Sequence, residues 1–199
     1  SNVTIDTDVP ALSSVSIASN GTGGILAKAT NEVTLTFTAN EAIGTPTVTF
    51  TSGGDDATNA DVVAGGANNT YTAKYTVAQG DTDGPVGFTI GFSDTAGNAG
   101  TAVTAIGITD SSGVTIDTTV PVINAIATTA FDWGAVLNTT ESASNGTVTI
   151  TTSGVENGQT LTLTLGGNDY TTTVDGNSNT ITIPSAVLGA LTNGNTYNF

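Results

Sequence analysis

Residues 32–39 read Glu-Val-Thr-Leu-Thr-Phe-Thr-Ala, so that Val33, Leu35 and Phe37 alternate with threonines. A period of two puts apolar side chains on one face of a strand and threonines on the other, which is typical of a half-buried antiparallel strand. The same alternation recurs at residues 71–77, 86–92, 161–165 and 181–183. Turn-forming Gly, Asn and Asp residues, for example at 52–56, separate these runs. The pattern predicts an all-β protein.

An internal repeat divides the chain into two modules. Val3-Thr4-Ile5-Asp6-Thr7-Asp8-Val9-Pro10 returns as Val114-Thr115-Ile116-Asp117-Thr118-Thr119-Val120-Pro121, with a single difference. The spacing is close to the ~100 residues of one immunoglobulin-type sandwich. We therefore expect two tandem immunoglobulin-like β-sandwich domains, at residues 1–115 and 116–199.

The second domain is expected to lack its last strand. A sixth strand would begin at Thr196, and the sequence ends at Phe199. Two interpretations follow: the sequence is an excerpt cut inside a repeat, or another strand closes the open edge, such as residues 1–6 of a neighbouring copy.

Composition excludes several classes of function. The formal charge is −15, from 17 acids against 2 basic residues, and arginine is absent, so a nucleic-acid footprint is excluded. Histidine and cysteine are also absent, which removes His-dependent catalysis, zinc sites and disulfides. No apolar run approaches the ~18 residues of a membrane span, so we expect no membrane insertion.

Acidic residues gather at the two poles of the predicted first sandwich. One pole is formed by the start of the first strand, by the BC loop after residues 32–39 and by the FG loop after residues 86–93. This pole receives Asp6, Asp8, Glu41, Asp94 and Asn98. The opposite pole, beside the next module, receives Asp81, Asp83, Asp117 and Glu156. Clustered carboxylates repel one another unless a cation neutralises them, and Ca²⁺ takes 6–8 oxygen ligands from irregular loops. The sequence therefore predicts calcium sites at both poles, whereas the remaining loop acids are ordinary turn residues.

Three motifs resemble a known family. The two Val-Thr-Ile-Asp-Thr openings, Asn40-Glu41-Ala42-Ile43 and Phe92-Ser93-Asp94-Thr95-Ala96-Gly97-Asn98 resemble the bacterial immunoglobulin-like repeats of giant adhesins, which include type-I-secreted, RTX-class biofilm adhesins. The resemblance implies an extracellular extender region on a bacterial cell surface, with neighbouring repeats of the same chain as partners and calcium at module junctions. It matches Asp6, Asp94 and Asn98 to the family's opening and FG-loop positions, and Asp117 to the opening alone. The adhesive tip and the glycine-rich secretion repeats lie outside this segment.

Two other classes of function are alternatives to this interpretation. Threonine rows such as Thr34, Thr36 and Thr38, or the aromatic residues Phe131 and Trp133, would suit a surface module that binds ice or carbohydrate. Threonine on a solvent-facing strand and an aromatic residue covering the core explain the same residues more simply. An enzyme is not expected, because the acids lie on loops without an accompanying base or nucleophile motif.

Overall fold

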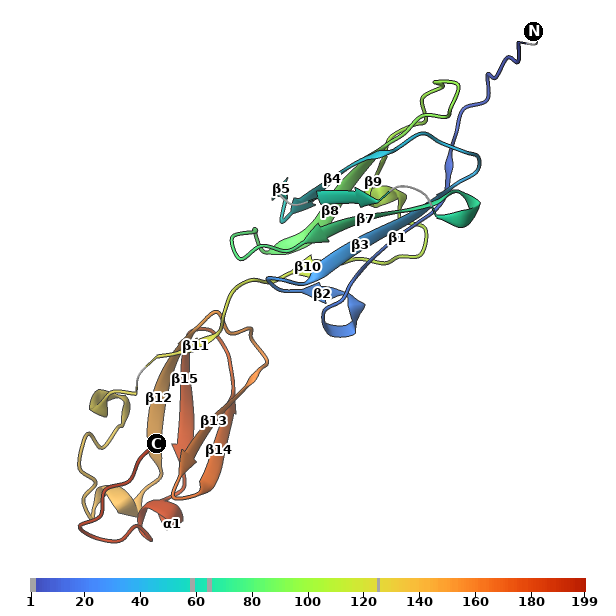
Figure 1. The fold of residues 1–199 in the computed structure, drawn as a ribbon. Helices are drawn as coiled ribbons and strands as arrows, with labels where there is room; N and C mark the ends of the chain where they lie inside the picture. The colour runs from blue at the N-terminus through green and yellow to red at the C-terminus, as the bar shows by residue number, and fades with distance from the viewer. Residues whose placement is uncertain (1–2, 58–59, 64–65, 125) are drawn as a thin grey trace. The chain divides into compact units, whose positions relative to one another are not determined.

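The structure is a computed structural model that describes residues 3–57, 60–63, 66–124 and 126–199 (Figure 1). The chain forms two compact units, Ser1–Thr118 and Thr119–Phe199. The division follows Thr118 rather than residue 115, because strand β10 (Thr115–Ile116) pairs with strands of the first unit. In the described part of the chain, no helix is long and apolar enough to cross a membrane.

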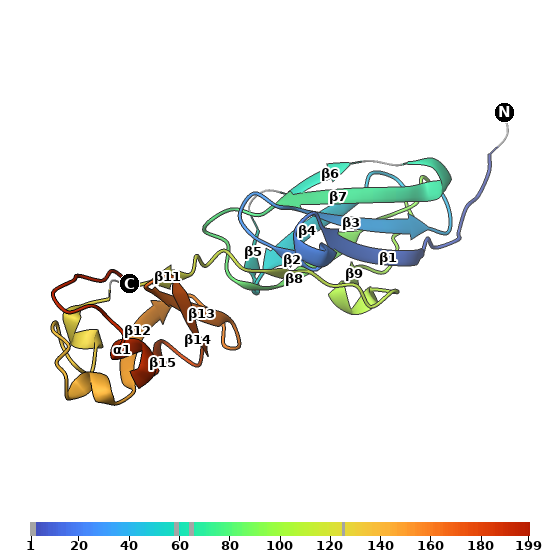
Figure 2. The ribbon, with the colours of Figure 1, turned by 90° about the horizontal axis from the view of Figure 1, so that it is seen from below.

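The first unit is a sandwich of two sheets (Figure 1 and Figure 2). One sheet has the order β1 (Leu12–Ser19), β3 (Glu32–Ala39), β7 (Thr70–Thr76), β6 (Ala60–Val63). The other has the order β2 (Leu26–Ala27), β10, β8 (Gly84–Gly91), β4 (Thr47–Ser52), β5 (Asp55–Asp56), with β9 (Val103–Thr104) also paired to β8. These orders correspond to A-B-E-D and G-F-C of an immunoglobulin fold, which confirms the predicted architecture.

The core of the first unit lies between its sheets. Val33, Leu35 and Phe37 on β3 have no exposed surface, as the alternation predicted. Phe37 stacks on Tyr71 with ring centroids 5.6 Å apart. The threonines between them, including Thr36, lie on the outer face of the same strand, where Thr36 pairs in register with Ser16 and Thr72.

The second unit contains two smaller sheets. The first has the order β11 (Val122–Ile123), β12 (Gly146–Ser153), β15 (Ser178–Ile183), and the second is the hairpin of β13 (Thr160–Leu165) and β14 (Asn168–Thr173). A second core, which includes Val148, Leu163 and Ile181, forms between them. A single helical turn, α1 (Ser185–Leu188), follows β15.

Residues 192–199 form no strand, so the strand predicted from Thr196 is absent from this segment. Instead the Tyr197 hydroxyl accepts a hydrogen bond from the Thr192 N–H at 2.9 Å, and the Phe199 ring packs on Phe131. A strand requires a neighbouring strand to accept and donate its backbone hydrogen bonds, and this segment folds back on itself instead.

Short 3₁₀ turns join the strands of both units. They are η1 (Thr22–Gly24), η2 (Ala67–Asn69), η3 (Ala105–Gly107), η4 (Thr128–Ala130) and η5 (Glu141–Ala143).

Candidate metal centre

Three carboxylates meet at one pole of the first unit. Oxygen atoms of Asp6, Glu41 and Asp94 all lie within 4.8 Å of one another. They come from different parts of the chain: Asp6 precedes β1, Glu41 follows β3, and Asp94 follows β8. The sandwich topology thus brings together residues that are far apart in sequence, as the sequence analysis expected of this pole.

Asp94 is the fixed member of the group. Its side chain is buried, and its Oδ1 accepts hydrogen bonds from the backbone N–H groups of Gly97 (2.6 Å) and Asn98 (2.7 Å). The Asn98 Nδ2 donates to Asp94 Oδ2 at 2.7 Å. These bonds, that of the Asn98 side chain foremost, lower the pKa of Asp94, so the carboxylate is ionised at neutral pH.

Glu41 is the carboxylate of the three whose surroundings disfavour its ionised form. Burial raises the pKa of Glu41 above its ordinary value of 4.5, and the negative charges of Asp6, Asp94 and Asp8 raise it further. The repulsion that the sequence analysis expected is therefore present in the folded unit.

Asp8 and Asn98 complete the predicted set at this pole. The Asp8 N–H donates to Asp6 Oδ1 at 3.1 Å, and the Asn98 Nδ2 donates to the Asp6 carbonyl at 3.2 Å. Asn98 therefore joins the segment before β1 to the loop after β8. Asp8 and Asn98 thus lie beside Asp6, Glu41 and Asp94, and the role of these five residues as calcium ligands stays a prediction.

Basic side chains do little to neutralise the negative charge of Asp6, Glu41 and Asp94. The sequence holds two basic residues, Lys28 and Lys74, and Lys74 Nζ pairs with Glu32 at 2.7 Å. Lys28 lies before β3 and Glu41 lies after it, and a strand of that length spans roughly 25 Å. The donor set, made of hard carboxylate oxygens on loops, fits Ca²⁺ better than the rigid octahedron of Mg²⁺.

The acids predicted for the opposite pole make different contacts. Asp83 Oδ1 accepts hydrogen bonds from the N–H (2.6 Å) and the hydroxyl (2.9 Å) of Thr118, and the Asp117 N–H donates to the Ala27 carbonyl at 2.9 Å. In the part of the chain that the structure describes, Asp81, Asp83 and Asp117 do not form a group of three within 4.8 Å of one another. Glu156 belongs to the second unit, in the turn after β12. A calcium site built from these residues stays a prediction.

Tyr75 is a partner of this loop that the sequence analysis missed. Its hydroxyl donates to Asp81 Oδ2, which also accepts the Ala78 N–H at 2.6 Å. Burial, followed by the hydrogen bond and the charge of Asp81, raises the pKa of Tyr75. An inward tyrosine at the end of a strand, with an aspartate in the turn that follows, is the signal that could have predicted this pair.

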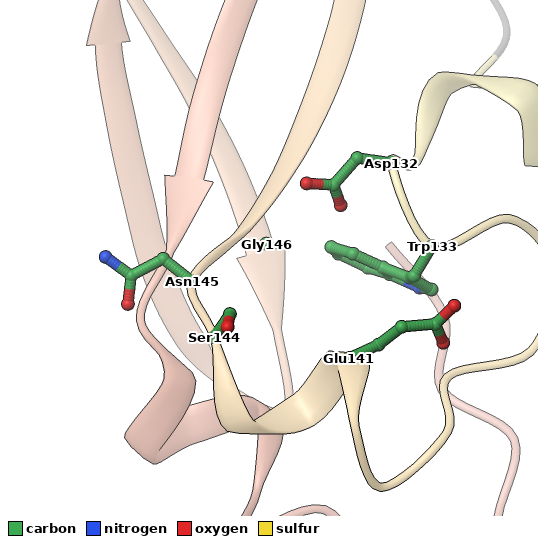
Figure 3. A pocket seen from close by; sticks show the side chains of 6 residues that line it. All are labelled: Asp132, Trp133, Glu141, Ser144, Asn145 and Gly146. Atoms are coloured by element: carbon green, nitrogen blue, oxygen red, sulfur yellow. The ribbon is translucent and has the colours of Figure 1, made fainter.

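The aromatic pair of the second unit covers its core. Phe131 and Trp133 are partly buried against the second core, with ring centroids 5.2 Å apart. A shallow pocket of about 170 Å³ lies beside the indole, lined by Asp132, Trp133, Glu141, Ser144, Asn145 and Gly146 (Figure 3). A Cβ at Gly146 would come within 2.1 Å of the indole ring, so Trp133 lies directly against the backbone of β12. This contact agrees with the core-covering interpretation of Trp133.

Comparisons with known proteins show a distant structural likeness. No protein-family model matches the sequence, and no curated protein matches it. Among solved structures, the chain is similar to titin Ig tandem domains, at 10% identity and a TM-score of 0.33, over 89% of this chain and 82% of that one. The fold assignment rests on the strand order of the sheets and not on this likeness. By that order, the chain is a tandem immunoglobulin-like β-sandwich protein with an acidic cluster at one pole of its first domain.

Proposed function

We propose that this chain is an extender segment of a bacterial cell-surface adhesin of the RTX class, in which calcium bound at the poles of immunoglobulin-like modules stiffens the chain. The observation that carries the proposal is the convergence of Asp6, Glu41 and Asp94 within 4.8 Å. The resemblance of the motifs around these residues to adhesin repeats supports the extracellular setting. The absence of cysteine agrees with stabilisation by ions rather than by disulfides.

The position of Asp6 gives calcium a mechanical role. Asp6 lies before β1, in a segment that belongs to neither sheet. Glu41 and Asp94, by contrast, follow strands of the sandwich. Without a cation, this segment is tied to the pole by the bond from Asn98 to the Asp6 carbonyl and by the bond from the Ala11 N–H to Asn40 Oδ1 at 2.8 Å. A cation shared by the three carboxylates would replace their repulsion by attraction and would fix the direction in which the segment leaves the domain.

The affinity expected of such a site suits a surface protein. Extracellular modules bind calcium at about 10⁻⁴–10⁻³ M, so the site would fill outside a cell and stay empty inside it. At a free calcium concentration 100 times Kd, one site would stabilise the folded unit by about 2.7 kcal/mol. The chain could therefore be exported unfolded and would gain stability after export.

The test is a calcium titration of the full chain, followed by calorimetry, thermal unfolding and small-angle scattering, with EDTA and magnesium as controls. We expect calcium, and not magnesium, to raise the melting temperature of the first unit and to narrow the distribution of molecular shapes. Asp94→Asn should abolish the calcium-dependent rise, whereas Asp56→Asn, which removes the same charge at an exposed position, should preserve it. A calcium effect that survives Asp94→Asn, or no effect in the parent chain, would refute the proposal.

The second predicted site needs its own variants. Asp117→Asn and Glu156→Gln test a calcium site at the junction between modules. If that site exists, these variants should lower the number of calcium ions bound in calorimetry and leave the site of Asp94 intact. An unchanged number would restrict calcium binding to the pole at Asp6.

A further inference from the structure

The two copies of the sequence repeat have opposite environments. In the second copy, Val114 is 3% and Ile116 is 1% exposed. In the first copy, Val3 is 89% and Ile5 is 84% exposed, although the residues are the same. Residues 3–9 form no strand, and the N-terminal end of the segment runs outward from the first unit (Figure 1), whereas Asp6 contacts the pole.

The second copy occupies a defined slot. Residues 115–116 form β10, which lies between β2, to which it is parallel, and β8, to which it is antiparallel. Its backbone is paired on both sides: the Thr115 N–H donates to the Ile25 carbonyl at 2.8 Å, and the Val86 N–H donates to the Val114 carbonyl at 2.9 Å. The side chains of Val114 and Ile116 enter the core of the first unit. The slot therefore recognises Val-Thr-Ile by two edges of backbone and two apolar positions.

We propose that Val3-Thr4-Ile5 is a docking strand that completes the sandwich of an adjoining immunoglobulin-like module, in a slot of the kind that β10 fills. The partner is a β-sandwich module that offers the strand one parallel and one antiparallel neighbouring strand. If residues 3–5 formed a strand in such a slot, the burial of the exposed side chains of Val3 and Ile5 would stabilise the folded module, as the burial of Val114 and Ile116 stabilises the first unit. Ser1 also corresponds in sequence to Ser112, so the likeness extends upstream of the strand.

The repeat would then mark the boundary between two modules. Its Val-Thr-Ile part closes one sandwich, and the residues from Asp6 onward lead into the next one. The strand pairing and core burial would lie within the preceding module, just as those of β10 lie within the first unit, and the chain would continue from this strand into the next module. This inference requires no calcium, so its tests are made in EDTA, where failure of the calcium proposal does not affect them.

The first experiment opens the slot in the full chain. Ile116→Asp should loosen β10, because it buries a charge in the core. A fluorescent peptide of residues 1–10 should then bind this variant and raise its melting temperature, and it should not bind the parent chain, whose slot is filled. A peptide carrying Ile5→Asp should bind at least about tenfold more weakly. Equal binding of the two peptides, or equal binding to the parent chain, would overturn the proposal.

A second experiment serves if Ile116→Asp prevents folding. A copy of residues 11–111 is placed before Ser1 of the full chain, so that Ser1 and Asn2 take the places of Ser112 and Gly113. The amides of Thr4 and Asp6 should then exchange with solvent as slowly as those of Thr115 and Asp117, which donate to Ile25 and Ala27. Ile5→Asp should lower the melting temperature of the added module and leave that of the unextended chain unchanged. Fast exchange at Thr4 and Asp6, or the same response of both chains to Ile5→Asp, would contradict the proposal.

Discussion

The hydroxyl of Tyr75 donates a hydrogen bond to the carboxylate of Asp81, which links the end of β7 to the loop before β8. Tyr75 has no exposed surface, and its ring stacks on Phe50 of the opposite sheet at a centroid distance of 5.7 Å. A single side chain thus joins the core of the first unit to a polar loop. The carboxylate that the sequence offers as a calcium ligand is used here as a hydrogen-bond acceptor.

Removal of this hydroxyl should destabilise the first unit. Tyr75→Phe leaves Asp81 with the Ala78 N–H and removes a bond to a charged acceptor, at a cost of about 1–3 kcal/mol in the free energy of unfolding. Tyr71→Phe is the matched control, because Tyr71 donates to the neutral carbonyl of Ile43 at 3.2 Å. Its cost should be about 0.5–1.5 kcal/mol. Denaturant unfolding of both variants measures the difference, and a larger loss in Tyr71→Phe would contradict this account.

The same pair predicts a response to alkaline pH. Because the pKa of Tyr75 is raised above its ordinary 10.0, the folded unit holds this proton over a range in which the unfolded chain has lost it. The contribution of Tyr75 is therefore fully present below pH 10.0 and declines as the pH rises above it. Thermal unfolding across this range should show a smaller decline in Tyr75→Phe than in the parent chain. Equal declines would mean that Tyr75 does not titrate with unfolding.

Glu41→Gln should have opposite effects with and without calcium. In EDTA, the variant should be as stable as the parent chain or more stable, because it removes a partly buried negative charge that Asp6, Asp94 and Asp8 repel. The variant should bind calcium roughly tenfold more weakly than the parent chain, because the site loses a charged ligand. Calorimetry and thermal unfolding in both conditions measure these effects. A loss of stability in EDTA would show that Glu41 has a structural role instead.

Calcium-dependent stabilisation should weaken in acid. The folded-state pKa of Glu41 lies above its ordinary value of 4.5. In calcium-free solution, the contribution of Glu41 to the stability of the folded unit is therefore fully present below pH 4.5 and is lost as the pH rises through the folded-state pKa. A bound proton competes with calcium, so the calcium-induced rise in melting temperature should shrink as the pH falls from about 7 through the pKa of Glu41. Asp94 acts in the opposite sense, because its pKa is lowered and its contribution is lost only as the pH falls below 3.8. In Glu41→Gln, the fall of the calcium effect should move to lower pH.

Gly146→Ala should destabilise the second unit alone. Its new methyl group would lie 2.1 Å from the Trp133 ring and 2.9 Å from Leu188, so the indole must leave its position. Such overpacking costs about 1–3 kcal/mol. Trp133 is the single tryptophan of the sequence, so its fluorescence reports the unfolding of this unit. Gly80→Ala is the control, because a Cβ there meets nothing within 4 Å, and its melting curve should match that of the parent chain.

Much of the fold follows from local patterns in the sequence. The alternation at Val33, Leu35 and Phe37 predicts both the strand and its buried face, because side chains on a strand point to opposite sides in turn. The repeat predicts two modules, and the topology of an immunoglobulin sandwich predicts that Asp6, Glu41 and Asp94 meet at one pole. These features depend on the order of residues along the strands and on a known order of strands.

Other features depend on contacts between distant segments, which only the tertiary structure decides. Val3-Thr4-Ile5 and Val114-Thr115-Ile116 are identical in sequence, yet only the second has its apolar side chains buried, because β2 and β8 supply its backbone partners. Asp81 and Asp94 are both loop acids, yet Asp81 accepts the hydroxyl of Tyr75 and Asp94 meets two other carboxylates. A strand or a carboxylate acquires its role from the groups that the fold places beside it, and local sequence does not specify those groups.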